Sequence, residues 1–263
     1  MIKNNLSKTF RYTNDNNIGL TFSYTSGYII NKPEGIDSLT TELTQAQGTN
    51  QIGSIVNSVN VQPRPITISG KILGGVDKKN NLLSAIRPDI GGKLYAYDPE
   101  KDEEYYLRVY PTISPIISAD NNGAYFQLSL LAPYPYWIKV GTTTSSNDRI
   151  TNNGQVPVPF KLTITSSGGD SSDIVIRNQA TFKHTFLRID KTIASNETLI
   201  VNITHDRVEA ISSTLGDVSG AIKLDSDFFR LEIGPNTIQA ISNGTGTLSL
   251  TFEYAEELVG IAV

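Results

Sequence analysis

Two histidines, His184 and His205, are the residues best suited to acid–base chemistry near neutral pH in this 263-residue sequence. An imidazole next to a carboxylate, as in His205-Asp206, could act as a general base or help to bind a metal. Adjacent strand residues point to opposite faces of a sheet, however, so we favour a turn between strands that end at Thr204 and start at Arg207. His184 is expected to face solvent. The sequence therefore predicts no catalytic residue and a protein that is not an enzyme.

Two acidic clusters and one glycine pair could hold a ligand. Asp225-Ser-Asp227 and Asp170-Ser-Ser-Asp173 offer hard oxygen atoms to calcium, but neither has the glycine and distal glutamate of a full calcium loop. We therefore interpret both as polar turns and predict no metal. Gly74-Gly75 lacks the Gly-Lys-Ser/Thr ending of a phosphate loop, and no dinucleotide fingerprint is present, so no cofactor is predicted.

Composition excludes further classes of function. The absence of cysteine excludes disulfides, thiolate metal sites and a cysteine nucleophile. A formal net charge of −4 gives no positive field for nucleic acid or an anionic membrane. No apolar run approaches the ~20 residues that cross a bilayer, and residues 1–12 contain no secretion signal. We expect a protein made in the cytosol that binds neither nucleic acid specifically nor a membrane.

The sequence divides after Val140 into two halves of different composition. Eleven of the 12 tyrosines precede the division, and both histidines follow it. The first half has 13 basic and 12 acidic residues, whereas the second has 9 and 14. Residues 141–147 are small, polar and without periodicity, as in a linker. We predict one domain over residues 1–140 and another over residues 141–263.

Apolar residues alternate with polar ones in both halves, which predicts an all-β and mainly antiparallel fold. In the second half the alternation is clearest at residues 160–164, 199–203 and 248–254, and it predicts a sandwich of two sheets. The first half adds one short helix, expected at residues 77–87 with Asp77 or Asn80 as its N-cap. Its strands are expected at residues 66–72, 93–97, 105–109 and 125–130.

Sugar binding is the main alternative among functions, because β-sandwiches are common lectin scaffolds. A sugar site usually has an aromatic platform, and the second half contains no Trp and only Tyr254, which alternates with core residues. Trp137 lies near the predicted junction, where packing is the simpler role. A carbohydrate-binding module or cell-surface adhesin thus remains the alternative, with a hydrolase third.

Three stretches of sequence, the first two separated by a helix, carry a resemblance to a known family. The first is Gln62-Pro-Arg-Pro-Ile-Thr-Ile-Ser-Gly-Lys-Ile-Leu73, which is followed by a helix and then by the second, Ala132-Pro-Tyr-Pro-Tyr-Trp137. The third is Phe229-Arg-Leu-Glu-Ile-Gly-Pro-Asn236, with its Leu-x-x-Gly-x-Asn pattern. Together they resemble the distal tail proteins of long-tailed bacteriophages over nearly the whole chain.

The resemblance implies a structural hub at the virion tail tip, assembled in the host cytoplasm. It implies a tail-tube-like sandwich or barrel domain that closes into a homo-hexameric ring, and a galectin-like sandwich domain after it. The implied partners are the tail tube protein, a tail-associated lysin or fibre protein, and receptor-binding or baseplate proteins. Subunit contacts are expected at Gln62, Arg64 and Ile66. Residues 45–60 could form an arm that reaches a neighbouring subunit, or an ordinary surface loop.

Overall fold

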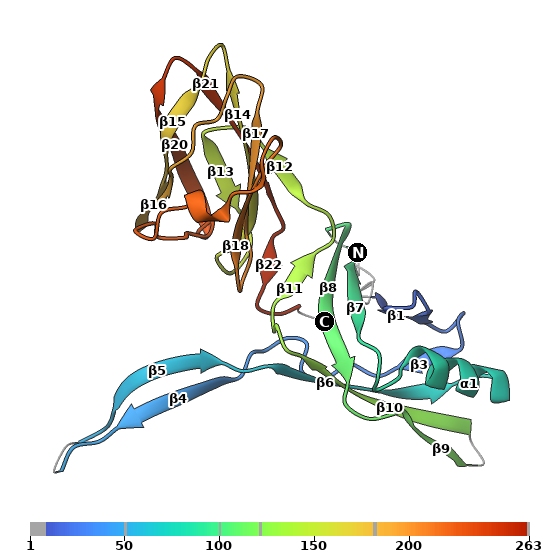
Figure 1. The fold of residues 1–263 in the computed structure, drawn as a ribbon. Helices are drawn as coiled ribbons and strands as arrows, with labels where there is room; N and C mark the ends of the chain where they lie inside the picture. Colours follow the sequence, from blue (N-terminus) through green and yellow to red (C-terminus); the bar gives the residue numbers. More distant parts are fainter. Residues whose placement is uncertain (1–8, 50–51, 100, 121–122, 181–182, 262–263) are drawn as a thin grey trace, which may run out of the picture. The chain divides into compact units, whose positions relative to one another are not determined.

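The computed structural model describes residues 9–49, 52–99, 101–120, 123–180 and 183–261. These residues form two compact units, one of residues 9–140 with 258–261 and the other of residues 141–257 (Figure 1). The division after Val140 lies where the composition changes. Residues 258–261, which the sequence assigned to the second domain, belong to the first unit instead, where the Ile261 N–H donates to the Ile36 carbonyl at 3.2 Å. Antiparallel strands and a single α-helix account for almost all regular structure described, which confirms the predicted all-β class.

The first unit is built on a sheet that curls back on itself. Its strands follow the order β2-β1-β7-β8-β10-β6-β3, with β9, β11 and β22 added beside this path. The two ends of the path, β2 and β3, are joined by residues 23–27, and the Tyr28 N–H donates to the Ser23 carbonyl at 3.2 Å. The sheet is therefore close to a closed barrel. The strands are β1 (Thr9–Asn14), β2 (Gly19–Phe22), β3 (Tyr28–Ile30), β6 (Arg64–Ile72), β7 (Gly92–Asp98), β8 (Glu103–Pro111), β9 (Ile116–Asp120), β10 (Gly123–Ala132), β11 (Trp137–Lys139) and β22 (Glu257–Leu258).

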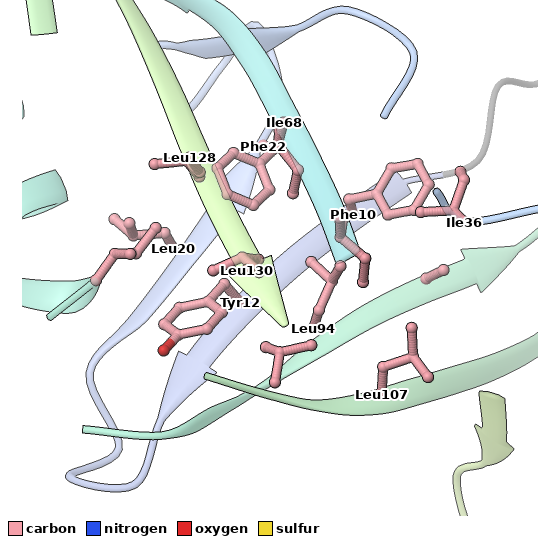
Figure 2. Close-up of a cluster of buried hydrophobic side chains, with 14 of the residues drawn as sticks. Phe10, Tyr12, Leu20, Phe22, Ile36, Ile68, Leu94, Leu107, Leu128 and Leu130 are labelled. Atoms are coloured by element: carbon pink, nitrogen blue, oxygen red, sulfur yellow. The ribbon is translucent and has the colours of Figure 1, made fainter. Parts of the chain in front are cut away.

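Alternating apolar residues of these strands form the core of the first unit, which Figure 2 shows in close-up. β6 illustrates the pattern, because its buried residues occur at every second position from Arg64 to Ile72. Helix α1 (Val76–Ala85) adds Leu82 and Ala85 to this core. The predicted side-chain cap of the helix is wrong: Gly75 is the N-cap, and no side chain bonds there.

The second unit is a sandwich of two antiparallel sheets, as predicted. One sheet has the order β12-β21-β14-β17-β18-β19 and the other β13-β20-β15-β16. Leu162, Val201 and Phe252 occupy one row across the first sheet and are buried in the core between the sheets. The elements are β12 (Thr143–Ser145), β13 (Arg149–Asn152), β14 (Phe160–Ser167), β15 (Ser171–Ala180), β16 (Lys183–Ile189), β17 (Thr198–Ile203), β18 (Val208–Ser212), β19 (Gly216–Asp217), the 3₁₀-helix η1 (Ser219–Ala221), β20 (Gly234–Gly244) and β21 (Thr247–Tyr254).

Two local features of this unit bear on the sequence predictions. The predicted linker, residues 141–147, contains strand β12, which pairs with β21 at the edge of the larger sheet. The Leu-x-x-Gly-x-Asn pattern is a turn held by buried Asn236, whose amide oxygen accepts the Glu232 N–H at 2.9 Å and whose amide nitrogen donates to the Glu232 carbonyl at 2.8 Å. Gly234 supplies the positive φ of 82° that this turn requires. No helix among the described residues is long and apolar enough to span a bilayer.

Candidate functional site

A hairpin of the first unit stands apart from the curled sheet. Strands β4 (Thr41–Ala46) and β5 (Ile55–Val61) pair with each other and with no other strand of the described chain. Every residue of both strands is exposed. In Figure 1 the hairpin extends away from the start of β6. Both of its edges therefore present backbone N–H and C=O groups that a further strand could pair with.

The hairpin also exposes aliphatic side chains, which a solvated surface hairpin would be expected to avoid. Leu43 lies directly opposite Val59, and Val61 is two residues further along β5, so these three side chains share one face. Their exposed fractions are 47%, 59% and 40%. Clustered exposed aliphatic residues at a free strand edge are typical of an interaction surface.

The side-chain hydrogen bonds described at the hairpin add little to its backbone pairing, because they lie in solvent. Gln62 Nε2 donates to Glu42 Oε2 at 2.8 Å, and Ser54 Oγ donates to Gln45 Oε1 at 2.7 Å, both in solvent. An isolated two-stranded hairpin is only marginally stable in water, because neither face is covered. This hairpin consequently fits a segment that is completed by a second surface.

The predicted contact residues Gln62, Arg64 and Ile66 lie at the base of this hairpin, and the structure corrects two of them. Ile66 is 1% exposed and belongs to the core, since it is on the inward-facing side of β6. Arg64 is 2% exposed and is occupied by bonds within its own unit. Only Gln62 is partly exposed, so neither Arg64 nor Ile66 is available to a neighbouring subunit.

The Arg64 guanidinium fastens three separate segments to the start of β6. Its Nε donates to the Pro135 carbonyl at 2.7 Å, Nη1 donates to the Gly35 carbonyl at 3.0 Å, and Nη2 donates to the Val259 carbonyl. Burial lowers the pKa of Arg64 from its ordinary value, and nearby Asp37 opposes that shift. The Pro-Arg-Pro motif therefore stabilises its own unit, whereas the sequence predicted a role for it in contacts between subunits.

The two histidines lie in separate parts of the second unit, His205 in a turn and His184 on β16. His205 and Asp206 lie in the turn between β17 and β18, as predicted, and Thr204 Oγ1 donates to Asp206 Oδ1 at 2.8 Å. Sequence reasoning missed the partner of His205, because Glu257 is 52 residues away: His205 Nε2 and Glu257 Oε1 are 3.0 Å apart, and Glu257 is 2% exposed. His184 is exposed on β16, as predicted.

The acidic clusters are used in local contacts. Asp227 accepts the Phe186 N–H at 2.9 Å, and Asp225 lies 3.6 Å from Arg188. Asp170 accepts the Ser195 N–H at 3.1 Å, and Asp173 accepts the amide of Asn243 at 3.0 Å. Among the described residues no three His, Asp or Glu side chains converge as metal ligands.

Neither aromatic residue considered for sugar stacking is accessible. Trp137 is fully buried in the first unit, where Nε1 donates to the Ile36 carbonyl at 3.0 Å. Tyr254 is 5% exposed, and its hydroxyl donates to the Thr151 carbonyl at 2.9 Å. Their rings therefore contribute to packing.

Comparison with known proteins identifies the class of the second unit. Residues 153–257 match the family of siphovirus-type tail components, C-terminal domain, whose model is named after the Dit protein of phage SPP1. This match confirms the resemblance to phage distal tail proteins predicted from the sequence. No curated protein matches the chain.

Two solved structures share the fold. The crystal structure of the SPP1 Dit (gp 19.1) protein, described as a paradigm of the hub adsorption apparatus in phages that infect Gram-positive bacteria, has a TM-score of 0.67 at 13% identity. The similarity covers 94% of this chain and 98% of that chain. The baseplate of phage P2, in its activated conformation with calcium, gives a TM-score of 0.50 at 10% identity, over 97% of this chain and 100% of that chain. At these identities the likeness establishes the fold, and it extends across both units.

Proposed function

We propose that this protein is the structural hub of a phage tail tip and carries out no catalysis. Six copies form a ring that joins the tail tube to a tail-associated lysin or fibre protein, while receptor-binding or baseplate proteins dock at the periphery. The first unit is the tail-tube-like, ring-forming domain, and the second is the galectin-like domain. The family match and the shared fold support the hub, and the β4–β5 hairpin is the observation that carries the ring.

A ring made from one repeated contact needs two complementary surfaces on each subunit. The hairpin supplies the first, because no part of the chain that the structure describes covers its free edges or the Leu43-Val59-Val61 face. Covering three roughly half-exposed aliphatic side chains contributes about 1 kcal/mol each, or about a hundredfold in association per contact. A ring repeats this contribution at every subunit boundary.

The ring is tested by measuring the mass of the purified protein by light scattering over a range of concentrations. We expect a species of six times the 28.7 kDa chain mass, or a concentration-dependent approach to it. Negative-stain images should show a ring with a central opening. A strict monomer at high concentration would contradict the hub.

The hairpin is tested by the triple substitution Leu43→Ser, Val59→Ser and Val61→Ser. We expect the hexamer to be lost while the melting temperature stays unchanged, because these side chains are exposed in the single chain. The matched control is Val76→Ser with Leu83→Ser, which removes exposed aliphatic side chains from α1 and should leave the ring intact. A ring that survives the triple substitution would show that another surface joins the subunits.

A further inference from the structure

The outward face of the smaller sheet of the second unit carries a diagonal line of arginines. Arg149 on β13 lies opposite Thr237 on β20, and Arg177 on β15 lies opposite Gln239, two residues along the same strand. Arg188 on β16 is opposite Val175, two residues from Arg177. The three arginines therefore occupy three successive rows of one face.

The alternation of burial confirms which face this is. Arg149, Arg177 and Arg188 are exposed, whereas the alternate residues Ile150, Asn178 and Leu187 are buried beneath them. With strands ~4.8 Å apart and a rise of ~3.4 Å per residue, the Cα atoms of Arg149 and Arg177 are about 12 Å apart, and those of Arg177 and Arg188 about 8 Å. An extended molecule crossing the sheet diagonally could contact all three.

The charge of this face contrasts with that of its unit. Residues 141–263 carry 9 basic and 14 acidic side chains. In the three rows that contain the arginines, however, no strand residue pointing outward is acidic, and the neighbouring Asp225 and Asp227 lie in the loop beside β16, where Asp227 accepts the Phe186 N–H. Among the described residues, no carboxylate pairs with Arg149 or Arg177, and Arg188 has only an exposed contact to Asp225 at 3.6 Å. Asp173, at the bulge beyond these rows, is bonded to Asn243.

A hollow lies next to the central arginine. It has a volume of about 240 Å³ and is lined by Arg177, Asn178, Gln179, His184, Thr185 and Phe186. Gln179 and His184 face each other across β15 and β16, and Arg177 faces Phe186 in the next row. The hollow thus combines a guanidinium, an amide, an imidazole and one apolar ring.

We propose that this face binds an acidic polysaccharide, in a role additional to that of the hub. Guanidinium groups bind carboxylate or phosphate in a bidentate manner, which accounts for the arginine line. The side chains of Gln179, Gln239 and Thr237 can both donate and accept, as sugar hydroxyl groups require. Phe186 offers an apolar surface to the C–H groups of a sugar ring. A surface that binds an acidic protein would be expected to have a larger apolar centre than this face has.

The test is calorimetric titration of the full chain at low ionic strength with polygalacturonate and with phosphomannan. These probes distinguish carboxylate from phosphate as the recognised group. We expect one of them to bind, and added salt to weaken binding by screening. Arg149→Gln combined with Arg177→Gln should raise the dissociation constant at least tenfold without lowering the melting temperature, since both side chains are exposed.

The matched control is Arg207→Gln, which removes a charge from the turn before β18, a strand of the other sheet, and should leave the dissociation constant within twofold. Neutral dextran should not bind. Failure of both acidic probes to bind, binding of dextran with equal affinity, or an unchanged constant in the double variant would overturn the proposal. Equal binding of polyglutamate would overturn the choice of a glycan in favour of an acidic protein. None of these outcomes depends on the ring, which light scattering tests separately.

Discussion

Replacing Arg64 by methionine should destabilise the first unit without altering its apolar packing. Methionine keeps most of the buried stem, but it leaves the carbonyls of Pro135, Gly35 and Val259 without their donor. An unsatisfied buried acceptor costs about 1 kcal/mol or more, so three cost about 3 kcal/mol. Replacing the charged guanidinium also removes the free-energy cost of burying it, and this gain offsets part of the loss. For this reason we take the lower end of the range of cost per unsatisfied acceptor.

Urea denaturation followed by tryptophan fluorescence measures this loss in the first unit alone. Trp137 is the only tryptophan of the chain and is fully buried in that unit, where its ring nitrogen donates to Ile36, the neighbour of Gly35. With a denaturant slope of about 2 kcal/mol per molar urea, the midpoint should fall by about 1.5 M.

Two further variants sharpen the interpretation. Arg64→Lys provides hydrogen-bond donors on a single nitrogen atom, but it lacks the planar guanidinium that reaches three carbonyls. Its urea midpoint should therefore lie between those of Arg64→Met and the wild type. Arg87→Gln removes an exposed arginine that pairs with Asp89, and it should shift the midpoint by less than about 0.3 M. If the Arg64→Met curve coincides with that of the wild type, the three hydrogen bonds do not stabilise the unit and the reasoning is refuted.

Two predictions concern the second unit. Leu162→Ala, at a fully buried position between Val201 and Phe252, should destabilise this unit by about 2–5 kcal/mol. The calorimetric unfolding transition of this unit should move to lower temperature, while the urea midpoint measured by Trp137 fluorescence stays unchanged. If the fluorescence midpoint shifted instead, the two units would not have separate cores. Burial alone would raise the pKa of Glu197, but hydrogen bonds from Lys191, Ser212, the Ala194 N–H and Thr214 outweigh burial and lower it to about 2. Because the pKa is lowered on folding, the ionised carboxylate stabilises the unit above pH ~4.5, and this contribution is lost as the pH falls toward 2. Between pH 5 and pH 2.5 the wild type should lose about 2 kcal/mol more than Glu197→Gln, and equal losses in the two calorimetric series would show that Glu197 is not responsible.

The strands were predictable because their signal is local. An apolar face that recurs at every second residue is visible in β6, β14 and β21 without knowledge of any partner strand, and it is buried in β6 and β14 and buried or partly buried in β21. The helix was also predictable, to within two residues at its C-terminal end, because Pro88 and the following glycines limit its extension.

Some of the features that the sequence did not reveal involve polar side chains with distant partners. Arg64 has the character of a surface residue in the sequence, and its burial depends on carbonyls as far away as Val259. The partner of His205, Glu257, is also remote along the chain, 52 residues away. Strand β12 was missed because its residues are exposed or half-buried at a sheet edge, where no apolar alternation is needed.

The arginine line was invisible in the sequence for a related reason. Arg149, Arg177 and Arg188 belong to three strands, and only the pairing of β13, β20, β15 and β16 places them on successive rows. The negative net charge of the second half argued against a basic surface, because net charge averages over both faces of both sheets.

The position of residues 258–261 has a consequence for how the protein is made. The ribosome completes the first 140 residues long before it reaches Val259 and Ile261, whose backbone groups bond to Arg64 and Ile36. During synthesis the earlier-made unit therefore lacks one of the three Arg64 hydrogen bonds and one of the two bonds to the Ile36 carbonyl until the intervening sandwich has emerged. A chain that stops before residue 258 would lack these bonds, so we expect its first unit to be less stable.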